Sequence, residues 1–245
     1  MSPAQVRGII FDLGSTLIEY ENRPWPDMSH EGQKLAYETL IAPLPSAPDF
    51  ESFSRRLEEI KNEFRARARE TLVEYSAADP PRQMFEECGW PEAEKLSREF
   101  IDLFYAVVRS SLTVEDGACE LLAEVKKRGY RLGLISNTIY PPEQHDKDME
   151  MFGLKSFFEW RIYSSTFGRR KPHPDIFRAG LERIGLPPEE TVYVGDRYYE
   201  DVQGAQQAGM AAVLKYCALR DYPDPMPNGF PVIHAIGELL TVLKA

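Results

Sequence analysis

The chain has 245 residues, a formal net charge of −10 and a sequence pI near 5.0. Hydrophobic residues make up 43% and charged residues 28%, which is the balance of a soluble globular protein long enough for one large domain or a core with an inserted smaller one. The acidic balance opposes binding to a nucleic-acid backbone, although a local cation can still bind a small phosphorylated molecule.

The cysteines and the apolar stretches bear on the cellular setting. Cys88, Cys119 and Cys217 are far apart and odd in number, which favours neither a disulfide framework nor a metal-binding knuckle. No apolar stretch has the form of a signal peptide or a membrane span. We therefore expect a cytoplasmic protein that binds neither membranes nor nucleic acid, while its oligomeric state stays open.

Short apolar runs in the first and last parts of the chain alternate with segments of helix length. Such runs are typical of parallel strands buried on both faces, and the alternation predicts a doubly wound, Rossmann-like α/β sheet. The expected strands are residues 6–11, 130–136, 160–165, 191–195 and 211–216. The expected helices are residues 117–128, 145–152, 174–185, 200–208 and 235–243.

Between Leu17 and Leu112 the pattern changes for roughly ninety residues, which is too long for a loop without structure. Apolar residues recur every three or four positions within 50–64 and 96–107, so each set occupies one face of a helix. These stripes indicate helix packing rather than a cofactor site. The prediction is a core of residues 1–17 and 113–245 with an inserted all-helical domain of residues 18–112.

Polar residues follow the apolar runs in four segments. Ligands bind beyond the carboxyl ends of the strands in an open parallel sheet, so these residues could share one pocket. Taken singly, each is more often an N-cap, a turn residue or an exposed side chain. Their joint, ordered occurrence favours a site. The residues are Asp12, Ser136, Asn137, Lys171, Asp196 and Asp201.

Phosphoryl transfer is a chemistry that these residues could share. The carboxylate of Asp12 could attack phosphorus and form an aspartyl-phosphate. Asp196 and Asp201 would add the oxygen ligands that a hard cation such as Mg²⁺ prefers. Lys171 would offset the remaining negative charge, and Ser136 could donate a hydrogen bond to a phosphoryl oxygen.

The segments FDLGST, LISNT, RRKPHPDIF and VGDRYYEDVQGAQQAGM resemble the four ordered motifs of the haloacid dehalogenase-like (HAD) hydrolase superfamily. The helical insertion resembles the C1-type cap of that superfamily, so the resemblance covers nearly the whole chain. It implies a Mg²⁺-dependent phosphatase that acts on a small phosphorylated metabolite through an aspartyl-phosphate.

The resemblance assigns roles in phosphoryl transfer to the matching residues. Asp12 would be the nucleophile. Ser136, with the backbone around Asn137, would bind the transferring phosphoryl group. Lys171 would bind the phosphoryl group as well and stabilise both the nucleophile and the phosphoenzyme.

The resemblance also implies a set of Mg²⁺ ligands. Asp12 and Asp196 would bind the metal directly, and Asp201 would act directly or through a water. The backbone carbonyl of Gly14 would supply a further oxygen. Glu200 is a weaker substitute for Asp201, since a solvated residue at a helix start is its more common role.

Glycine at position 14 is a departure from the usual motif. In phosphatases of the superfamily an aspartate at this position protonates the leaving group and then deprotonates the attacking water. A positioned general acid or base contributes about 10²–10⁴-fold in rate. Glu19, Tyr20 and His30 are conceivable substitutes, but no spacing supports any of them.

Two alternatives to a phosphatase stay open. Some superfamily members with this glycine are phosphatases. The glycine also suits a catalytically impaired protein that binds phosphorylated metabolites or has a regulatory role. Dehalogenases and phosphonatases lack the aspartate too. Dehalogenation needs no metal, so the acidic pair Asp196 and Asp201, which suits a metal, argues against a dehalogenase. Phosphonate cleavage would need a cap lysine such as Lys34 or Lys61. The sequence does not identify the substrate.

Overall fold

The computed structural model describes residues 6–244, and its centre is a six-stranded parallel sheet in the order β5–β4–β1–β6–β7–β8. Since β1 lies between β4 and β6, the chain leaves the centre of the sheet in both directions, which confirms the predicted doubly wound α/β class. The strands are β1 (Gly8–Phe11), β4 (Arg131–Ser136), β5 (Trp160–Tyr163), β6 (Thr191–Gly195), β7 (Ala211–Lys215) and β8 (Val232–Ile233).

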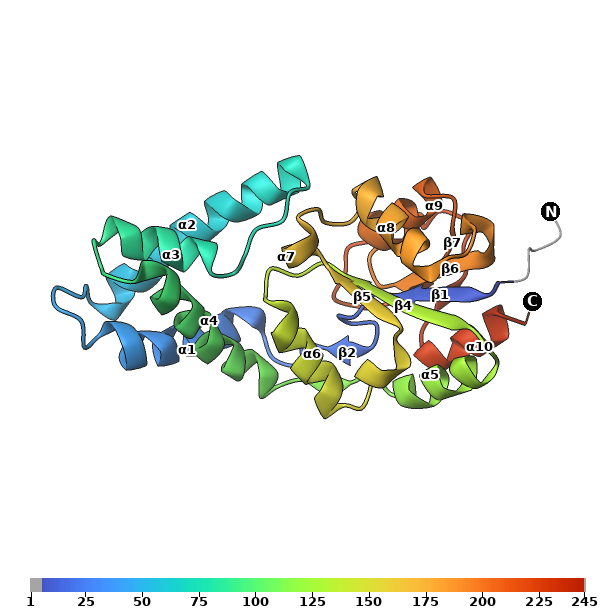
Figure 1. Ribbon diagram of the computed structural model, residues 1–245, viewed down its shortest axis with the longest axis horizontal. Helices are drawn as coiled ribbons and strands as arrows, with labels where there is room; N and C mark the ends of the chain where they lie inside the picture. The colour runs from blue at the N-terminus through green and yellow to red at the C-terminus, as the bar shows by residue number, and fades with distance from the viewer. Residues whose placement is uncertain (1–5, 245) are drawn as a thin grey trace.

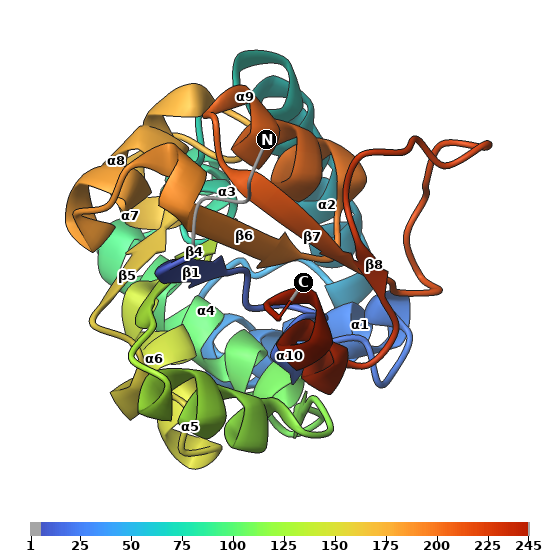
Figure 2. The same ribbon diagram turned by 90° about the vertical axis from the view of Figure 1, so that its right-hand side faces the viewer.

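Helices cover both faces of the sheet (Figure 2). Alternate side chains of β1 enter different cores: Ile9 and Phe11 pack with α5, whereas Ile10 packs with α8. One face carries α5 (Ala118–Lys127), α6 (Pro142–Met151) and α10 (Leu239–Val242), and the other carries α8 (Pro174–Ile184) and α9 (Gly204–Gln207). Short helical turns occupy Lys155–Phe157, Ser164–Phe167 (α7), Pro188–Glu190, Tyr198–Gln203 and Ile236–Glu238.

A helical unit, defined here as residues 25–109, lies beyond the carboxyl ends of the strands (Figure 1). Phe53, Leu57 and Ile60 of α2 are buried against Phe85 of α3 and Phe100 of α4, as the apolar stripes predict. Each such burial contributes about 1.5–3 kcal/mol to stability. The unit contains α1 (Trp25–Ala36), a π-helical turn (Tyr37–Ile41), α2 (Phe50–Thr71), α3 (Asp79–Glu87) and α4 (Ala93–Arg109).

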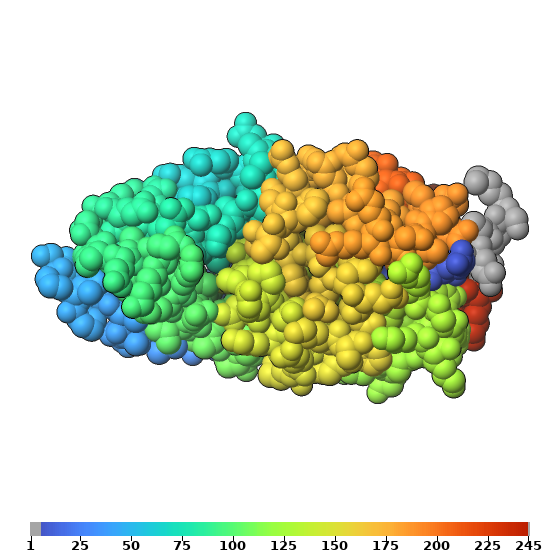
Figure 3. All heavy atoms as spheres, viewed as in Figure 1, coloured from blue at the N-terminus to red at the C-terminus, as the bar shows by residue number. Residues whose placement is uncertain are grey.

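The helical unit contacts the sheet layers at several places, and the space-filling view shows them as one elongated body (Figure 3). An antiparallel ribbon of β2 (Ile18–Glu19) and β3 (Thr113–Val114) forms where the chain enters and leaves the unit. After α2, the N–H of Glu74 donates to the carbonyl of Gly168 at 3.2 Å. The ribbon lies at the expected domain boundaries, although the division into two domains stays a prediction, and residues 1–5 and 245 of the predicted core lie outside the described residues.

All five predicted strands form, and the differences from prediction are local. Helix α6 begins at Pro142 rather than at residue 145, because a proline is well tolerated in the first turn of a helix. The segment Ser164–Phe167 is a helical turn rather than the end of β5. The two-residue strands β2, β3 and β8 were not predicted, because so short a segment shows no repeating pattern of apolar residues.

Two further observations concern the cellular setting. The three cysteines are free thiols. Within residues 6–244, every helix is too short or too polar to cross a lipid bilayer.

Candidate active site at the carboxyl ends of the strands

The ammonium group of Lys171 is buried at the carboxyl end of β1. Its Nζ lies 2.7 Å from an oxygen of Asp12, 2.7 Å from an oxygen of Asp201 and 2.8 Å from the hydroxyl of Tyr193. Burial alone would lower the pKa of Lys171, but the two carboxylates outweigh it and raise the pKa above its usual value. The side chain therefore stays charged although only 2% of the residue is exposed.

The loops around Lys171 are fixed by local contacts. Asp12 directly follows β1, and its N–H donates to the carbonyl of Val194 at 2.8 Å. The side chain of Asn137 accepts from the N–H of Lys171 at 2.7 Å and donates to the carbonyl of Lys171 at 3.0 Å. Asn137 thus positions Lys171 with its amide, which leaves only its backbone for the predicted binding of a phosphoryl group.

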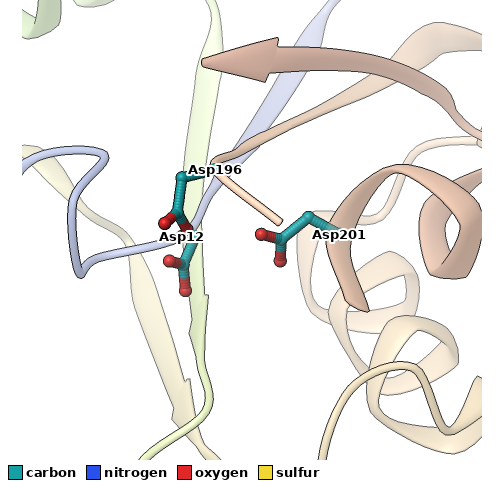
Figure 4. Close-up of side chains that lie close together, drawn as sticks. All are labelled: Asp12, Asp196 and Asp201. Atoms are coloured by element: carbon teal, nitrogen blue, oxygen red, sulfur yellow. The ribbon is translucent and has the colours of Figure 1, made fainter. Parts of the chain in front are cut away.

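Three carboxylates converge at the ends of the strands (Figure 4), and Lys171 contacts two of them. Asp12, Asp196 and Asp201 each place an oxygen within 4.8 Å of the others. Burial raises the pKa of Asp196 to about 7, and the charges of Asp12 and Asp201 add to this shift. Burial likewise raises the pKa of Asp12, although Lys171 opposes the effect. One ammonium group faces three carboxylates, so the cluster has an excess of negative charge.

Glycine permits the close approach of Asp201 to this cluster. A Cβ added at Gly195 would lie 2.4 Å from Cγ of Asp201, a distance that no side chain tolerates. Any other residue at the end of β6 would therefore push Asp201 away from Lys171.

The acidic cluster has the chemistry of a site for a divalent cation. The Oδ1 atom of Asp196 is buried and has no hydrogen-bond partner within the described part of the chain. Such an atom costs free energy unless a ligand satisfies it. Both oxygens of Asp201 already accept hydrogen bonds, from Lys171 and from the N–H of Arg197 at 2.9 Å. The residues present therefore fit a hard cation such as Mg²⁺, with Asp12 and Asp196 as the carboxylates free to bind it.

Arg220 supplies additional positive charge to the cluster. It lies between β7 and β8, and its Nε donates to Oδ2 of Asp196. Its other nitrogens donate to Glu21 at 2.6 Å and to the hydroxyl of Ser15 at 2.9 Å. No motif surrounds Arg220, so this contact could not be predicted from the sequence.

The cluster adjoins a pocket of about 720 Å³ between the sheet and the helical unit, a volume typical of sites for small molecules. Asp196 and Asp201 are buried beside Asp12 rather than exposed on the pocket wall. The predicted residues that do line the pocket are Asp12, Gly14, Ser136, Asn137 and Lys171.

A family model for haloacid dehalogenase-like hydrolases matches residues 6–209. This match extends over most of the chain and includes all the residues of the cluster. The chain belongs to the haloacid dehalogenase-like hydrolases.

Several curated proteins resemble this HAD-like chain. Glyceraldehyde 3-phosphate phosphatase of Methanothermobacter thermautotrophicus is 37% identical over 50% of this chain and 55% of its own length. The enzyme of that name from Methanopyrus kandleri is 27% identical over 85% of this chain and 83% of its own. Phosphoserine phosphatase of Thermus thermophilus is 33% identical over 60% and 57%. For the first of these relatives the matched region spans about half of its length.

Solved structures share the fold. A HAD phosphatase from Thermococcus onnurineus matches 97% of this chain and 98% of its own with a TM-score of 0.64. A 2-haloacid dehalogenase from Pseudomonas syringae matches 98% of both chains with a TM-score of 0.66. Each is 22% identical, so these likenesses concern the fold alone.

Of the three conceivable substitutes for an acid at Gly14, only Tyr20 lines the pocket. Its ring lies 3.7 Å from a Cβ built on Gly14. Glu19 instead accepts a hydrogen bond from the N–H of Glu21 at 2.7 Å, and the ring of His30 packs against Phe50.

Neither candidate lysine of the helical unit lines the large pocket. Lys34 is exposed and lies 3.9 Å from Glu38. Lys61 forms an ion pair with Glu58 and lines a separate cavity of about 40 Å³. The geometry therefore gives no support to phosphonatase chemistry.

A buried polar network that the sequence did not reveal forms part of the pocket wall, which Tyr20, Tyr105, Thr138 and His145 line. Nε2 of His145 is 2.6 Å from the hydroxyl of Thr138, and Nδ1 is 3.2 Å from the hydroxyls of both Tyr20 and Tyr105. Tyr105 also donates to Asp148 at 2.5 Å. Burial lowers the pKa of His145 to about 4, so the ring is neutral at physiological pH. The network joins α4 and α6 to the loop that follows β4.

Binding of Mg²⁺ should weaken as the pH falls below about 7. Protons compete with the cation for Asp196, whose pKa is raised to about 7. The affinity for Mg²⁺ should therefore be highest above this pH and decline below it. Titration calorimetry at about pH 6 and about pH 8 measures the change, which is at most about 10-fold per pH unit for one proton. Affinity independent of pH would contradict this protonation of the cluster, and Glu200→Gln is the control that should retain the dependence.

Acid should destabilise the protein through His145. Between the unfolded pKa of about 6.5 and the folded value of about 4, the unfolded chain binds a proton that the folded protein does not. The free energy of unfolding should therefore fall with decreasing pH by up to about 1.4 kcal/mol per unit from this group. Urea unfolding across this pH range should show that the free energy of unfolding depends less steeply on pH in His145→Gln than in the wild type. The exposed His30→Gln should have the slope of the wild type. Equal slopes in all three proteins would refute this role.

Proposed function

We propose that the protein is a Mg²⁺-dependent phosphatase that hydrolyses a small phosphorylated metabolite through phosphorylated Asp12. The observation that carries this proposal is the contact between Asp12 and the buried Lys171 on the wall of a pocket of metabolite size. The phosphatase names of three relatives agree with it. The helical unit would act as a cap that excludes water, and we expect a cytoplasmic enzyme.

Each residue of the cluster has a role in the proposed reaction. An oxygen of Asp12 attacks phosphorus, the bond to the leaving oxygen breaks, and water later hydrolyses the aspartyl-phosphate. Lys171 neutralises part of the charge on Asp12 and on the phosphoryl oxygens. Ser136, which lines the pocket, donates a hydrogen bond to one of those oxygens. Mg²⁺, held by Asp12, Asp196 and the carbonyl of Gly14, with Asp201 supporting the site, would shield negative charge as it develops.

Gly14 leaves this mechanism without its usual proton donor. Within the described residues, no carboxylate lies within 4 Å of a Cβ built on Gly14, and the side chain found there is the ring of Tyr20. The leaving oxygen then takes its proton from water, which lowers the rate for poor leaving groups. The absence of this acid also favours a second candidate function, a protein that binds phosphorylated metabolites with little turnover.

Asp12→Asn should abolish Mg²⁺-dependent hydrolysis, lowering kcat by about 10³-fold or more, because the amide cannot attack phosphorus. Release of phosphate from 4-nitrophenyl phosphate and from a panel of metabolite phosphates measures the loss. Glu200→Gln removes a nearby carboxylate outside the cluster and should keep wild-type activity. A wild-type protein with no such turnover, or an Asp12→Asn variant as active as the wild type, would exclude the phosphatase.

Gly14→Asp should raise kcat for an alkyl phosphate such as glycerol 3-phosphate by about 10²-fold, because it adds the missing acid. The side chain fits, since the nearest heavy atom to its Cβ is 3.7 Å away and the φ angle is not left-handed. Gly14→Asn is the matched control, equal in size but unable to transfer the proton. Equal rates for the two variants would show that proton transfer does not limit the reaction.

A further inference from the structure

Cationic side chains outnumber anionic ones on the wall of the large pocket. The anionic residues are Asp12, Glu21 and Glu74. The cationic residues are Arg65, Arg69, Arg170, Lys171, Arg197 and Arg220. Several of these cations have carboxylate partners. Lys171 pairs with Asp12, Arg170 lies 3.5 Å from Glu74, and Arg220 lies 2.6 Å from Glu21.

The remaining arginines have little or no compensation. Within residues 6–244, no carboxylate forms an ion pair with Arg69 or Arg197. Arg65 lies 3.5 Å from Glu58, but that carboxylate already pairs more closely with Lys61. The guanidinium groups of Arg65 and Arg69 on the pocket wall are thus available to an anion that enters it.

Two of these arginines come from the helical unit. Asn62, Arg65, Ala66 and Arg69 line the pocket and follow the spacing of one face of a helix, so the last turns of α2 present a polar stripe to the pocket. The carboxylate cluster and Lys171 come from the loops at the ends of the strands. A molecule held at both places would therefore have a phosphate at one end and a separate anionic group at the other.

We propose that the substrate is a phosphate monoester that carries a second anionic group, a carboxylate or a second phosphate, bound by Arg65 and Arg69. This inference rests on the proposed function for the phosphate end of the molecule. A guanidinium group binds either anion through two parallel, charge-assisted hydrogen bonds. A monoester with an uncharged far end would leave both guanidinium groups without an anion. The enzyme should therefore prefer the acid over the corresponding aldehyde or alcohol.

Paired substrates test the inference directly. 3-Phosphoglycerate and glyceraldehyde 3-phosphate share a carbon skeleton and differ in an acid against an aldehyde, while glucose 1,6-bisphosphate and glucose 6-phosphate test a second phosphate. We expect kcat/KM to favour the doubly anionic member of at least one pair by at least about 10-fold. The double variant Arg65→Gln/Arg69→Gln should lower that preference about 10- to 100-fold, the effect of losing charge-assisted hydrogen bonds.

The control variant is Arg67→Gln. Arg67 lies on the same helix, with its guanidinium carbon 5.7 Å from the centre of the Phe64 ring, and it does not line the pocket. It should keep the wild-type preference. Thermal unfolding of the double variant shows whether it folds, and the single variant Arg69→Gln, at an exposed position, provides a second measurement.

The outcomes separate this inference from the proposed function. Equal kcat/KM values within both pairs, or a preference that Arg65→Gln/Arg69→Gln leaves intact, would overturn the second-anion subsite while the phosphatase stands. Absence of Mg²⁺-dependent hydrolysis of every ester, 4-nitrophenyl phosphate included, would overturn the phosphatase instead. Calorimetric binding of each pair to Asp12→Asn with Mg²⁺ then decides the subsite: tighter binding of the doubly anionic member supports it, and equal binding refutes it.

Discussion

The ion pair between Lys171 and Asp12 is the interaction on which the site depends. Burial raises the pKa of Asp12, and a protonated carboxyl group is a poor nucleophile. The ammonium of Lys171 opposes this shift at 2.7 Å and is itself kept charged by Asp12 and Asp201. Removing Lys171 would leave the buried carboxylates of Asp12 and Asp201 without their shared cation, and an uncompensated buried charge costs about 3–5 kcal/mol. The amide of Asn137 and the absence of a side chain at Gly195 serve this one arrangement.

The helical unit is joined to the same loops. Glu74, in the segment after α2, accepts a hydrogen bond from the hydroxyl of Ser164 at 2.7 Å, and that hydroxyl accepts from the N–H of Thr138 at 2.8 Å. Thr138 follows Ser136 and Asn137 in the chain. The position of the helical unit and the shape of the loop that follows β4 are therefore linked through Ser164. The arginines of α2 face a pocket whose other wall the sheet provides.

The sequence predicted the fold and the carboxylate cluster because both depend on local patterns. Buried strands give continuous apolar runs, and Asp12 and Asp196 directly follow such runs. The stripe of Phe53, Leu57 and Ile60 predicted a packed helix in the same way. These features survive in a single sequence because each is encoded within a few residues.

Other features could not be predicted because they depend on contacts between distant segments. Arg220 reaches Asp196 from a segment without a motif, and His145 meets Tyr105 only after α4 and α6 pack together. The spacing of Arg65 and Arg69 places both on one face of a helix, but a polar stripe on a helix usually faces water. Only the packed structure shows that this one lines a pocket.

Chemical identification of the phosphorylated residue tests the central claim most directly. The protein is mixed with Mg²⁺ and a phosphate ester, quenched in acid within milliseconds and reduced with borohydride, which converts an aspartyl-phosphate to homoserine. Peptide mass spectrometry then locates the modified position. The account predicts homoserine at position 12 and at no other aspartate. Turnover of the ester with Asp12 unmodified, or with the label on Asp196 or Asp201, would contradict it.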